Sequence, residues 1–330
     1  MKVQLIKKFG DPSVFELSKI PKPDLKSGHV LIKVHATSVN QIDYKIRAGL
    51  VNAIAPDFPA VLHGDFSGVV EAVASDVTGF IIGSEVYGCA GGLKGSGGAL
   101  AEYMLVDAKL IAKKPKSLSM LEAAALPLVS ITAWDALFNK AKLTNKNNIL
   151  IHGGAGGVGH IAVQLAKWCG AQVYATVLKN EDFSRVKSFG ADEIINAKEE
   201  SVDHYVTRLT GGQGFDIVFD TVGGQNLDKS LIAAAINGSV VTTAARSSHD
   251  LTPMHSTALS LSAVFMLLPL LKNRWRETHG KILSEIAKIV DEGKLKPLID
   301  PHQFTLDTVG DAHALLESGN AQGKVVLLVA

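Results

Sequence analysis

The sequence predicts an α/β protein in which a β-rich region is followed by a doubly wound parallel sheet. From residue 148 onward, short apolar stretches alternate with segments of helical spacing, as in a parallel sheet covered by helices on both faces. Residues 1–115 instead contain short alternating stretches between glycine and proline turns, which is typical of a barrel or sandwich. The length of 330 residues also favours two domains over one.

Three segments of the β-rich region alternate apolar and polar residues like strands with one buried face, namely residues 30–36, 69–73 and 101–106. Turn signals lie between them at residues 26–28 and 57–59 and in the glycine-rich run 91–98.

Near residue 119 the pattern changes. Ser119 and Glu122 have the spacing of a capping box, which predicts a helix over residues 120–138 that Pro127 divides.

The second half of the chain supplies the alternating elements. We expect strands at residues 148–152, 172–177, 215–220 and 238–244, and helices at 159–168, 181–189 and 225–235. The remaining sequence predicts an apolar segment over 255–271, a helix with an apolar stripe over 280–292, a polar turn that opens at Phe304, a helix over 309–317 and a final strand over 324–329.

Charge and cysteine content exclude several classes of protein. The formal net charge of +1, from 33 basic and 32 acidic residues, predicts no basic surface for nucleic acid or for an anionic membrane. The longest apolar stretch, residues 259–271, is too short to span a bilayer. Cys89 and Cys169 are too few for a disulfide framework or a four-thiolate zinc site. The first residues lack the apolar core of a signal peptide, so we expect a cytoplasmic protein.

A glycine-rich turn follows the strand expected at residues 148–152. Gly154, Gly156 and Gly159 fill the pattern G-x-G-x-x-G, and a helix with an apolar face comes next. The first glycine allows a tight turn, the second lets the backbone approach a pyrophosphate, and the third lets the helix pack on the strand. The alternative is a turn without a ligand. The strand and helix around it favour a dinucleotide site, formed by Gly154, Ala155, Gly156, Gly157 and Val158.

The end of the second strand bears on the choice of cofactor. An NAD-binding domain has a carboxylate there for the ribose 2′-hydroxyl, whereas residues 176–177 of this chain contain none. Thr176, Lys179 and Arg185 could contact a 2′-phosphate, and we therefore predict NADPH over NADH. Glu181 and Asp182 follow closely and weigh against this prediction. In the alternative interpretation, Lys179 and Arg185 are ordinary solvated charges.

Two further strand ends carry candidate cofactor contacts. Ligands of a doubly wound sheet lie outside the carboxyl ends of its strands. We therefore expect backbone from Val222 and Gly223, and from Thr243 and Ala244, near the adenosine ribose and the nicotinamide.

These features together resemble the medium-chain dehydrogenase/reductase superfamily, and within it the zinc-free quinone oxidoreductases, including the ζ-crystallin-like and alkenal/enone reductase branches. The resemblance covers nearly the whole chain and is carried by residues 39–43 with Arg47 and Gly49, and by residues 63–70, 124–128, 132–134, 151–167, 188–192, 218–223 and 323–327. It implies a GroES-like catalytic domain made of residues 1–120 and 265–330, with a Rossmann nucleotide-binding domain, residues 121–264, inserted into it and the active site in the cleft. It also implies a homodimer paired through the edge segment 259–271.

The resemblance also implies that no metal is bound. Zinc enzymes of the superfamily have a cysteine where this chain has Asn40, and the histidine of their Gly-His-Glu segment falls on Gly64. His63 stands one residue early, and on a strand this shift points a side chain to the opposite face. An unfamiliar site of His63 with Asp65 and Cys89 is the alternative.

Without a metal, the acceptor must be activated already, because only hydrogen-bond donors would polarise its carbonyl. Asn40 is the first candidate donor, and the alternative is an asparagine that caps a turn. Tyr44 is a candidate proton donor, although related sequences have the aromatic residue one position later, where this chain has Lys45. The resemblance places Thr132 beside the nicotinamide, and the alternative is plain helix packing. We also expect Lys324 to contact the cofactor, and Asp43 and Arg47 to form an ion pair.

Three functions fit these predictions. The first is NADPH-dependent reduction of quinones, and the second is reduction of the C=C bond of an alkenal or enone. In both, the partner is a small-molecule electrophile. The third is an NADPH-binding structural or sensor protein with little activity.

Overall fold

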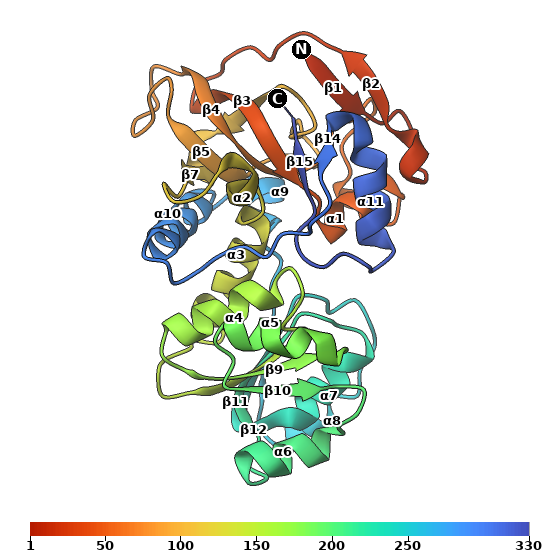
Figure 1. The fold of residues 1–330 in the computed structure, drawn as a ribbon, viewed down its shortest axis with the longest axis vertical. Helices are drawn as coiled ribbons and strands as arrows, with labels where there is room; N and C mark the ends of the chain where they lie inside the picture. Colours follow the sequence, from red (N-terminus) through yellow and green to blue (C-terminus); the bar gives the residue numbers. More distant parts are fainter. Residues whose placement is uncertain (330) are drawn as a thin grey trace. The chain divides into compact units, whose positions relative to one another are not determined.

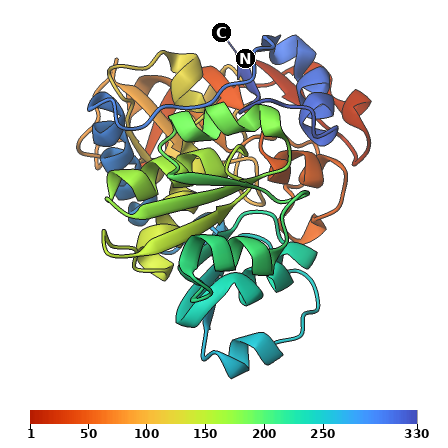
Figure 2. The same ribbon diagram turned by 60° about the horizontal axis from the view of Figure 1, so that its bottom comes forward.

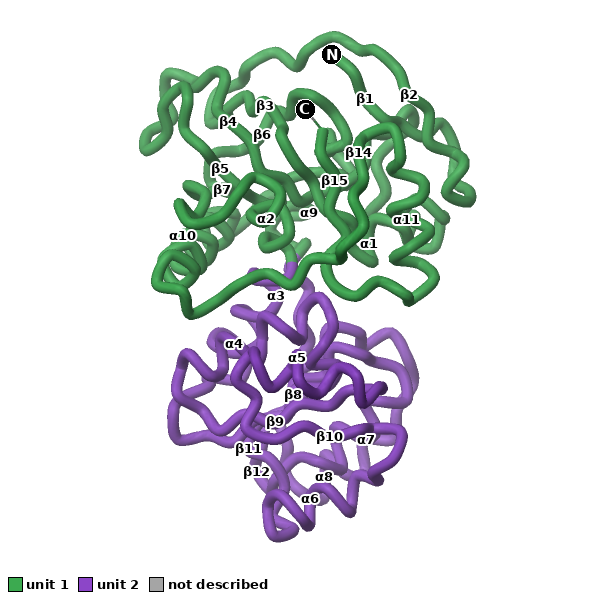
Figure 3. Tube along the Cα trace, viewed as in Figure 1, with its two compact units in different colours: residues 1–128, 267–330 green, residues 129–266 purple. Residues whose placement is uncertain are grey.

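A computed structural model describes residues 1–329, and it divides into two compact units. Unit 1 consists of residues 1–128 and 267–330, and unit 2 of residues 129–266 (Figures 1 and 3). Unit 1 is therefore made of two stretches of chain, and unit 2 is the continuous segment inserted between them.

Unit 1 is built on an open, mostly antiparallel sheet whose strands follow the order β14-β15-β3-β4-β5-β7, with β6 also paired to β3. A separate hairpin joins β1 to β2. The strands are β1 (Lys2–Leu5), β2 (Glu16–Lys19), β3 (His29–Ser38), β4 (Asp65–Val73), β5 (Glu85–Cys89), β6 (Tyr103–Asp107), β7 (Ile111–Lys113), β14 (Phe304–Thr305) and β15 (Val326–Leu328).

Helices pack against both the central strands and the edge of this sheet, since α2 contacts β3 and β4. The helix α10 packs against β7, and the phenol of Tyr87 on β5 donates a hydrogen bond to the carbonyl of Leu283 on α10 at 2.6 Å. The helices of unit 1 are α1 (Gln41–Arg47), α2 (Met120–Ala124), α9 (Leu268–Lys272), α10 (Glu277–Asp291) and α11 (Val309–Glu317). The element α3 (Pro127–Trp134) begins at the boundary between the units.

Unit 2 contains a six-stranded parallel sheet in the order β10-β9-β8-β11-β12-β13. Figure 2 shows α4 and α5 on one side of this sheet and α6 and α7 on the other. The strands are β8 (Asn148–His152), β9 (Gln172–Val177), β10 (Glu193–Asn196), β11 (Phe215–Asp220), β12 (Ala234–Thr242) and β13 (Ser260–Ala263). The helices are α4 (Gly159–Trp168), α5 (Phe183–Ser188), α6 (Val202–Thr210), α7 (Gln225–Ala233) and α8 (Thr252–Ser256).

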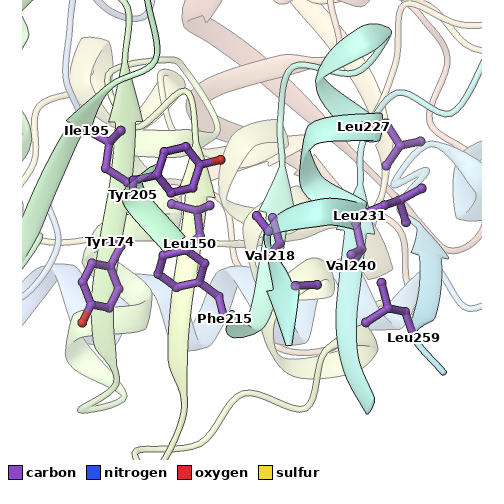
Figure 4. Packing of buried hydrophobic residues seen from close by; sticks show 12 residues of the cluster. Leu150, Tyr174, Ile195, Tyr205, Phe215, Val218, Leu227, Leu231, Val240 and Leu259 are labelled. Atoms are coloured by element: carbon purple, nitrogen blue, oxygen red, sulfur yellow. The ribbon is translucent and has the colours of Figure 1, made fainter. Parts of the chain in front are cut away.

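One side of the sheet in unit 2 forms a hydrophobic core with α6 and α7 (Figure 4). Leu150, Phe215 and Val218 come from the central strands, and Tyr205 and Leu231 come from the covering helices. Burial of aliphatic and aromatic side chains of this size removes apolar area from water at roughly 25 cal/mol per Å², which is the main term that holds the helices on the sheet.

The predicted α/β class and the doubly wound sheet are confirmed, and β8, α4, β9, β11 and α11 have the predicted bounds. The helix expected over 120–138 is divided at Pro127 as predicted, and it ends in a π-helical segment (Asp135–Lys140).

Several predicted boundaries are wrong. The chain passes directly from α7 into β12 at Ala234, because β12 pairs with β11 from Phe215 onward, so residues 234–235 are strand. The segment expected as apolar over 255–271 contains the short strand β13 and the helix α9. Among the described residues, no helix is long and apolar enough to cross a membrane.

Candidate functional site

The turn between β8 and α4 has the close backbone contacts that its glycines predict. Gly153 has a φ of +70°, so the left-handed residue of the turn stands one position before Gly154. A Cβ on Gly159 would lie 2.0 Å from the carbonyl oxygen of Gly153, and one on Gly154 would lie 2.8 Å from the Cβ of Ala175. These two glycines therefore let the start of α4 approach the ends of β8 and β9.

The turn presents backbone donors that could bind an anion. Gly154 and Gly156 use their N–H groups internally, donating to the carbonyls of Thr176 and Gly153 at 2.9 Å each. In the described part of the chain, the N–H groups of Ala155, Gly157 and Val158 have no acceptor. They stand at the amino end of a ten-residue helix, where the helix dipole also favours negative charge. A diphosphate would therefore fit this turn.

Thr176, predicted to contact a 2′-phosphate, forms a hydrogen bond with the backbone of the turn. Its side chain is buried, and its hydroxyl oxygen accepts a hydrogen bond from the N–H of Gly153 at 3.2 Å. The same oxygen lies 3.2 Å from Nδ1 of His152, a buried histidine whose Nε2 has no partner among the described residues. Burial lowers the pKa of His152 to about 4, so this imidazole is neutral at pH 7.

Lys179 and Arg185 are placed differently from each other. Lys179 is exposed directly after β9 and forms no ion pair with any described carboxylate. Arg185 lies on α5, and its Nη1 is 3.2 Å from Oδ1 of Asp182. Asn180, beside Lys179, accepts a hydrogen bond from the side-chain amide of Asn196 at 2.7 Å, which ties this segment to the end of β10.

The ends of β11 and β12 are joined by one carboxylate. Asp220 accepts hydrogen bonds from the N–H groups of Val222 and Gly223 at 3.0 and 3.1 Å, and from the hydroxyl of Thr242 at 3.1 Å. A Cβ on Gly223 would lie 2.4 Å from the Cβ of Ala244. The predicted pairs 222–223 and 243–244 therefore lie side by side at the carboxyl edge of the sheet. Thr132 is buried on α3.

In unit 1, a buried polar cluster surrounds the side chain of Asn40, which immediately precedes α1. Its Nδ2 donates to Oδ2 of Asp65 at 2.8 Å, and its Oδ1 accepts a hydrogen bond from Nζ of Lys324 at 2.5 Å. The ammonium of Lys324 also contacts the carbonyl of Val39 at 3.3 Å and Oδ2 of Asp65 at 3.6 Å. Asn40 therefore does more than cap a turn, because two buried charges fix both ends of its amide.

Asp43 completes this cluster from the first turn of α1. Its carboxylate accepts a hydrogen bond from the N–H of Asn40 at 2.7 Å. Burial raises the pKa of Asp43 to about 7, while the hydrogen bond from Asn40 opposes the shift and the charge of Asp65 adds to it. Burial lowers the pKa of Lys324, and the carboxylate of Asp65 opposes that shift.

The expected ion pair between Asp43 and Arg47 is wrong. The guanidinium of Arg47 is fully buried and reaches in another direction, where its Nη1 donates to the carbonyl of Gly10 at 2.8 Å and its Nη2 lies 2.5 Å from Oε2 of Glu317. Arg47 therefore ties α1 to the end of α11. Tyr44 is half-buried on α1, and burial raises the pKa of its phenol.

The side chains of the alternative metal site, His63, Asp65 and Cys89, do not fit a zinc ion. His63 has a φ of +70°, and its imidazole contacts the hydroxyl of Thr37 through Nδ1 at 3.1 Å and Nε2 of His313 at 2.8 Å. Burial raises the pKa of the Cys89 thiol well above its usual range, which disfavours the thiolate that zinc requires. No group of three or more His, Cys, Asp or Glu side chains within residues 1–329 could hold a metal ion.

Sequence reasoning missed the partners of Asn40. The sequence predicts Asp65 only as a ligand of the alternative metal site and Lys324 only as a cofactor contact, whereas both side chains face the amide of Asn40. The helix α1 and the pair His63–His313 were also missed. The available signal was that Asp65 and Lys324 both lie in segments that carry the family resemblance. Nothing in the sequence showed that the two side chains would meet at Asn40.

Comparison with known proteins agrees with this architecture. A family model described as an alcohol dehydrogenase GroES-like domain matches residues 26–116, and one described as a zinc-binding dehydrogenase matches residues 189–327. A crystal structure of an alcohol dehydrogenase superfamily protein from Novosphingobium aromaticivorans has a TM-score of 0.96 and 37% identity and covers 100% of both chains. The Escherichia coli quinone oxidoreductase complexed with NADPH has a TM-score of 0.88 and 26% identity, over 99% of this chain and 100% of that one.

Two curated relatives match most of the chain. The 2-methylene-furan-3-one reductase of Solanum lycopersicum is 36% identical over 97% of this chain and 76% of its own length. The quinone oxidoreductase of Homo sapiens is 30% identical over 100% of this chain and 98% of its own. Other relatives are named as chloroplastic or mitochondrial, so the cytoplasmic location stays a prediction. The chain belongs to the medium-chain dehydrogenase/reductase superfamily, as an oxidoreductase of the quinone and alkenal reductase type.

Proposed function

We propose that this chain is a zinc-independent, NADPH-dependent oxidoreductase that reduces quinones. The observation that carries the proposal is the amide of Asn40, held between Lys324 and Asp65 where a metal ligand would stand. A neutral hydrogen-bond donor suits an acceptor that is already electrophilic, whereas an ordinary ketone needs stronger polarisation. Quinones and enones are acceptors of the first kind.

The residues of unit 2 would hold the nucleotide. The N–H groups of Ala155, Gly157 and Val158 would bind its diphosphate. When bound, the nicotinamide supplies the hydride. Backbone at residues 222–223 and 243–244 would contact the ribose and nicotinamide, because this edge of the sheet is where ligands of such folds lie. Thr132 on α3 would pack near the nicotinamide.

We infer NADPH over NADH from Lys179. Its ammonium is exposed beyond β9 and free of any described ion-pair partner, so a 2′-phosphate could neutralise it. Arg185 would be a weaker contact because Asp182 already pairs with it. The name of one structural relative includes NADPH, which supports the same choice.

The acceptor would bind at Asn40. One hydrogen on Nδ2 goes to Asp65, and the second would donate to the carbonyl oxygen of the acceptor as negative charge develops there. Lys324 positions this donor by holding Oδ1, so it acts on the acceptor through Asn40, and its three hydrogens already face Oδ1, the carbonyl of Val39 and Asp65. Tyr44 is the candidate proton donor, although its phenol forms no hydrogen bond with the Asn40 cluster among the described residues.

A second candidate is reduction of the C=C bond of an α,β-unsaturated carbonyl. The relative from Solanum lycopersicum is named as a reductase of a 2-methylene-furan-3-one, a compound of this class, and it is 36% identical to the chain. The same donor at Asn40 would stabilise an enolate oxygen, and a proton must then be delivered to carbon, which quinone reduction does not require.

Oxidation of NADPH, followed at 340 nm with 9,10-phenanthrenequinone and with a 2-alkenal in parallel, tests this assignment. The proposal predicts faster turnover with the quinone at equal concentration. Turnover with the alkenal alone would favour the second candidate, and NADPH binding without oxidation by either acceptor would favour a structural or sensor role.

We also propose a homodimer formed through the edge of the sheet in unit 2. Among the described strands, β13 pairs only with β12, and Ile232 and Ile236 are exposed on the adjoining α7 and β12. An open strand edge of this kind favours pairing with a second copy. Light scattering coupled to gel filtration should give twice the mass of 34.9 kDa, and a monomer at micromolar concentration would contradict the proposal.

A further inference from the structure

A second cluster of reactive side chains lies in unit 2, in the segment between β12 and α8. Oγ of Ser247 is 2.5 Å from Nε2 of His249. Nδ1 of the same imidazole is 2.8 Å from Oδ1 of Asp228, which lies in the first turn of α7. The three groups therefore stand in the order hydroxyl, imidazole and carboxylate, each within hydrogen-bond distance of the next.

The carboxylate determines the proton positions in this cluster. An ionised aspartate only accepts hydrogen bonds, so Nδ1 of His249 must carry its proton toward Asp228. Nε2 then has a lone pair, and the hydroxyl of Ser247 donates to it. An imidazole in this tautomer can take the proton of the hydroxyl as the oxygen attacks an electrophile, which is the arrangement of a serine nucleophile with its general base.

The hydroxyl of Ser247 is accessible to solvent, whereas the imidazole of His249 is nearly buried. Ser247 is exposed, whereas only 8% of the side chain of His249 is exposed. The N–H groups of Ser248 and His249 have no acceptor among residues 1–329, so donors for a developing oxyanion stand next to the nucleophile. Because Ser247 is exposed, esters with small acyl groups and good leaving groups suit the site better than esters with long acyl chains.

We propose that Ser247, His249 and Asp228 form a nucleophilic site that hydrolyses small activated esters, as a second activity separate from hydride transfer. The oxygen of Ser247 forms a bond to the ester carbonyl carbon while His249 takes its proton. The bond from that carbon to the leaving oxygen then breaks, and the leaving alcohol receives the proton from His249. Water releases the acyl group from Ser247 by the reverse sequence, so ester and water give acid and alcohol without any oxidation.

Labelling with phenylmethanesulfonyl fluoride, read by intact mass and peptide mapping, tests the site directly. We expect one adduct at Ser247, and loss of the adduct in Ser247→Ala and in His249→Ala. Ser256→Ala is the matched control, because Ser256 is also exposed but its hydroxyl donates to the carbonyl of Pro253 at 3.2 Å. Labelling of Ser247 no faster than of Ser256, or unchanged labelling in His249→Ala, would overturn the proposal.

Hydrolysis of p-nitrophenyl acetate gives the catalytic readout. Ser247→Ala and His249→Ala should each lower the enzyme-dependent rate at least about tenfold, and Asp228→Asn should lower it less in this half-exposed position. NADPH binding should be unchanged in Ser247→Ala, which shows that the variant is folded and separates this proposal from the oxidoreductase function. An unchanged rate of ester hydrolysis in folded Ser247→Ala would contradict it.

Discussion

Nζ of Lys324 lies 2.5 Å from Oδ1 of Asn40, although the two residues are 284 positions apart in the sequence. The contact joins the C-terminal return of the chain to the segment between β3 and α1, inside unit 1. With Asp65 on the other end of the amide, it fixes which way Asn40 presents its donor. This orientation is the basis of the site proposed for the acceptor.

Lys324→Met should destabilise unit 1, because it leaves the carboxylate of Asp65 buried without its ion-pair partner. Removal of one member of a buried pair typically costs about 3–5 kcal/mol of the free energy of unfolding. Urea unfolding checks this value. The double variant Lys324→Met with Asp65→Asn should recover part of the loss, since the carboxylate that loses its ion pair is then replaced by a neutral amide, and additive losses in the double variant would contradict the coupling.

Asn40→Ala should lower kcat for the quinone by roughly 10- to 100-fold, as expected when one donor to a developing oxyanion is removed. The affinity for NADPH should change little, because Asn40 belongs to unit 1 and the proposed nucleotide contacts to unit 2. Steady-state kinetics with Gln41→Ala, the exposed neighbour on α1, provide the control. Equal turnover of Asn40→Ala and wild type with quinone and alkenal alike would remove Asn40 from the acceptor site.

Lys179→Glu should raise the KM for NADPH at least about tenfold and leave the KM for NADH nearly unchanged, because the new carboxylate would repel only the 2′-phosphate. Lys146→Glu is the matched control, since Lys146 is also exposed but precedes the amino end of β8. An equal increase of the KM values for NADPH and NADH would mean that Lys179 does not contact the 2′-phosphate.

The buried pair His63–His313 should make the protein less stable as the pH falls below about 6.5. Burial lowers the pKa of His63 to about 3 and that of His313 well below its usual value, so the unfolded chain binds more protons in this range. The contribution of the two neutral histidines to the free energy of unfolding is fully present above pH 6.5 and is lost as the pH falls toward 3. Asp43 acts in the opposite direction between about pH 4 and 7, because its pKa is raised.

Urea unfolding of His313→Phe at several pH values isolates the histidine contribution. We expect a shallower fall of the unfolding free energy between pH 6.5 and 4 than in wild type, because one of the two titrating groups is gone. His255→Gln, at an exposed histidine outside this pair, is the control. If the unfolding free energy of His313→Phe falls with pH as steeply as that of wild type, a group other than His313 causes the loss of stability.

The local elements of unit 2 were predictable because each strand and helix carries its own pattern. The glycine turn is an example, since its glycines and its flanking strand and helix all lie within residues 148–168. The boundary between α7 and β12 was not, because residues 233–235 are all alanine and contain no periodic signal. There the pairing of β12 with β11 decides the structure.

The candidate site in unit 1 was predictable only in part. Asn40 could be chosen from its motif, but its contacts with Asp65 and Lys324 depend on how β3, β4 and the C-terminal segment meet in the fold. Arg47 shows the same limit. Its expected partner was Asp43, four residues earlier, whereas the folded chain brings Glu317 to it from 270 positions away.

Isothermal titration of the purified chain with NADPH and with NADH shows whether the turn between β8 and α4 holds a dinucleotide. We expect one NADPH to bind per chain, more tightly than NADH, and the affinity to fall at least about tenfold in Gly159→Ala, whose new Cβ would lie 2.0 Å from the carbonyl oxygen of Gly153. Gly97→Ala, where a Cβ meets nothing within 4 Å, should bind like wild type. Folded wild-type protein that binds neither nucleotide would contradict a dinucleotide site at this turn.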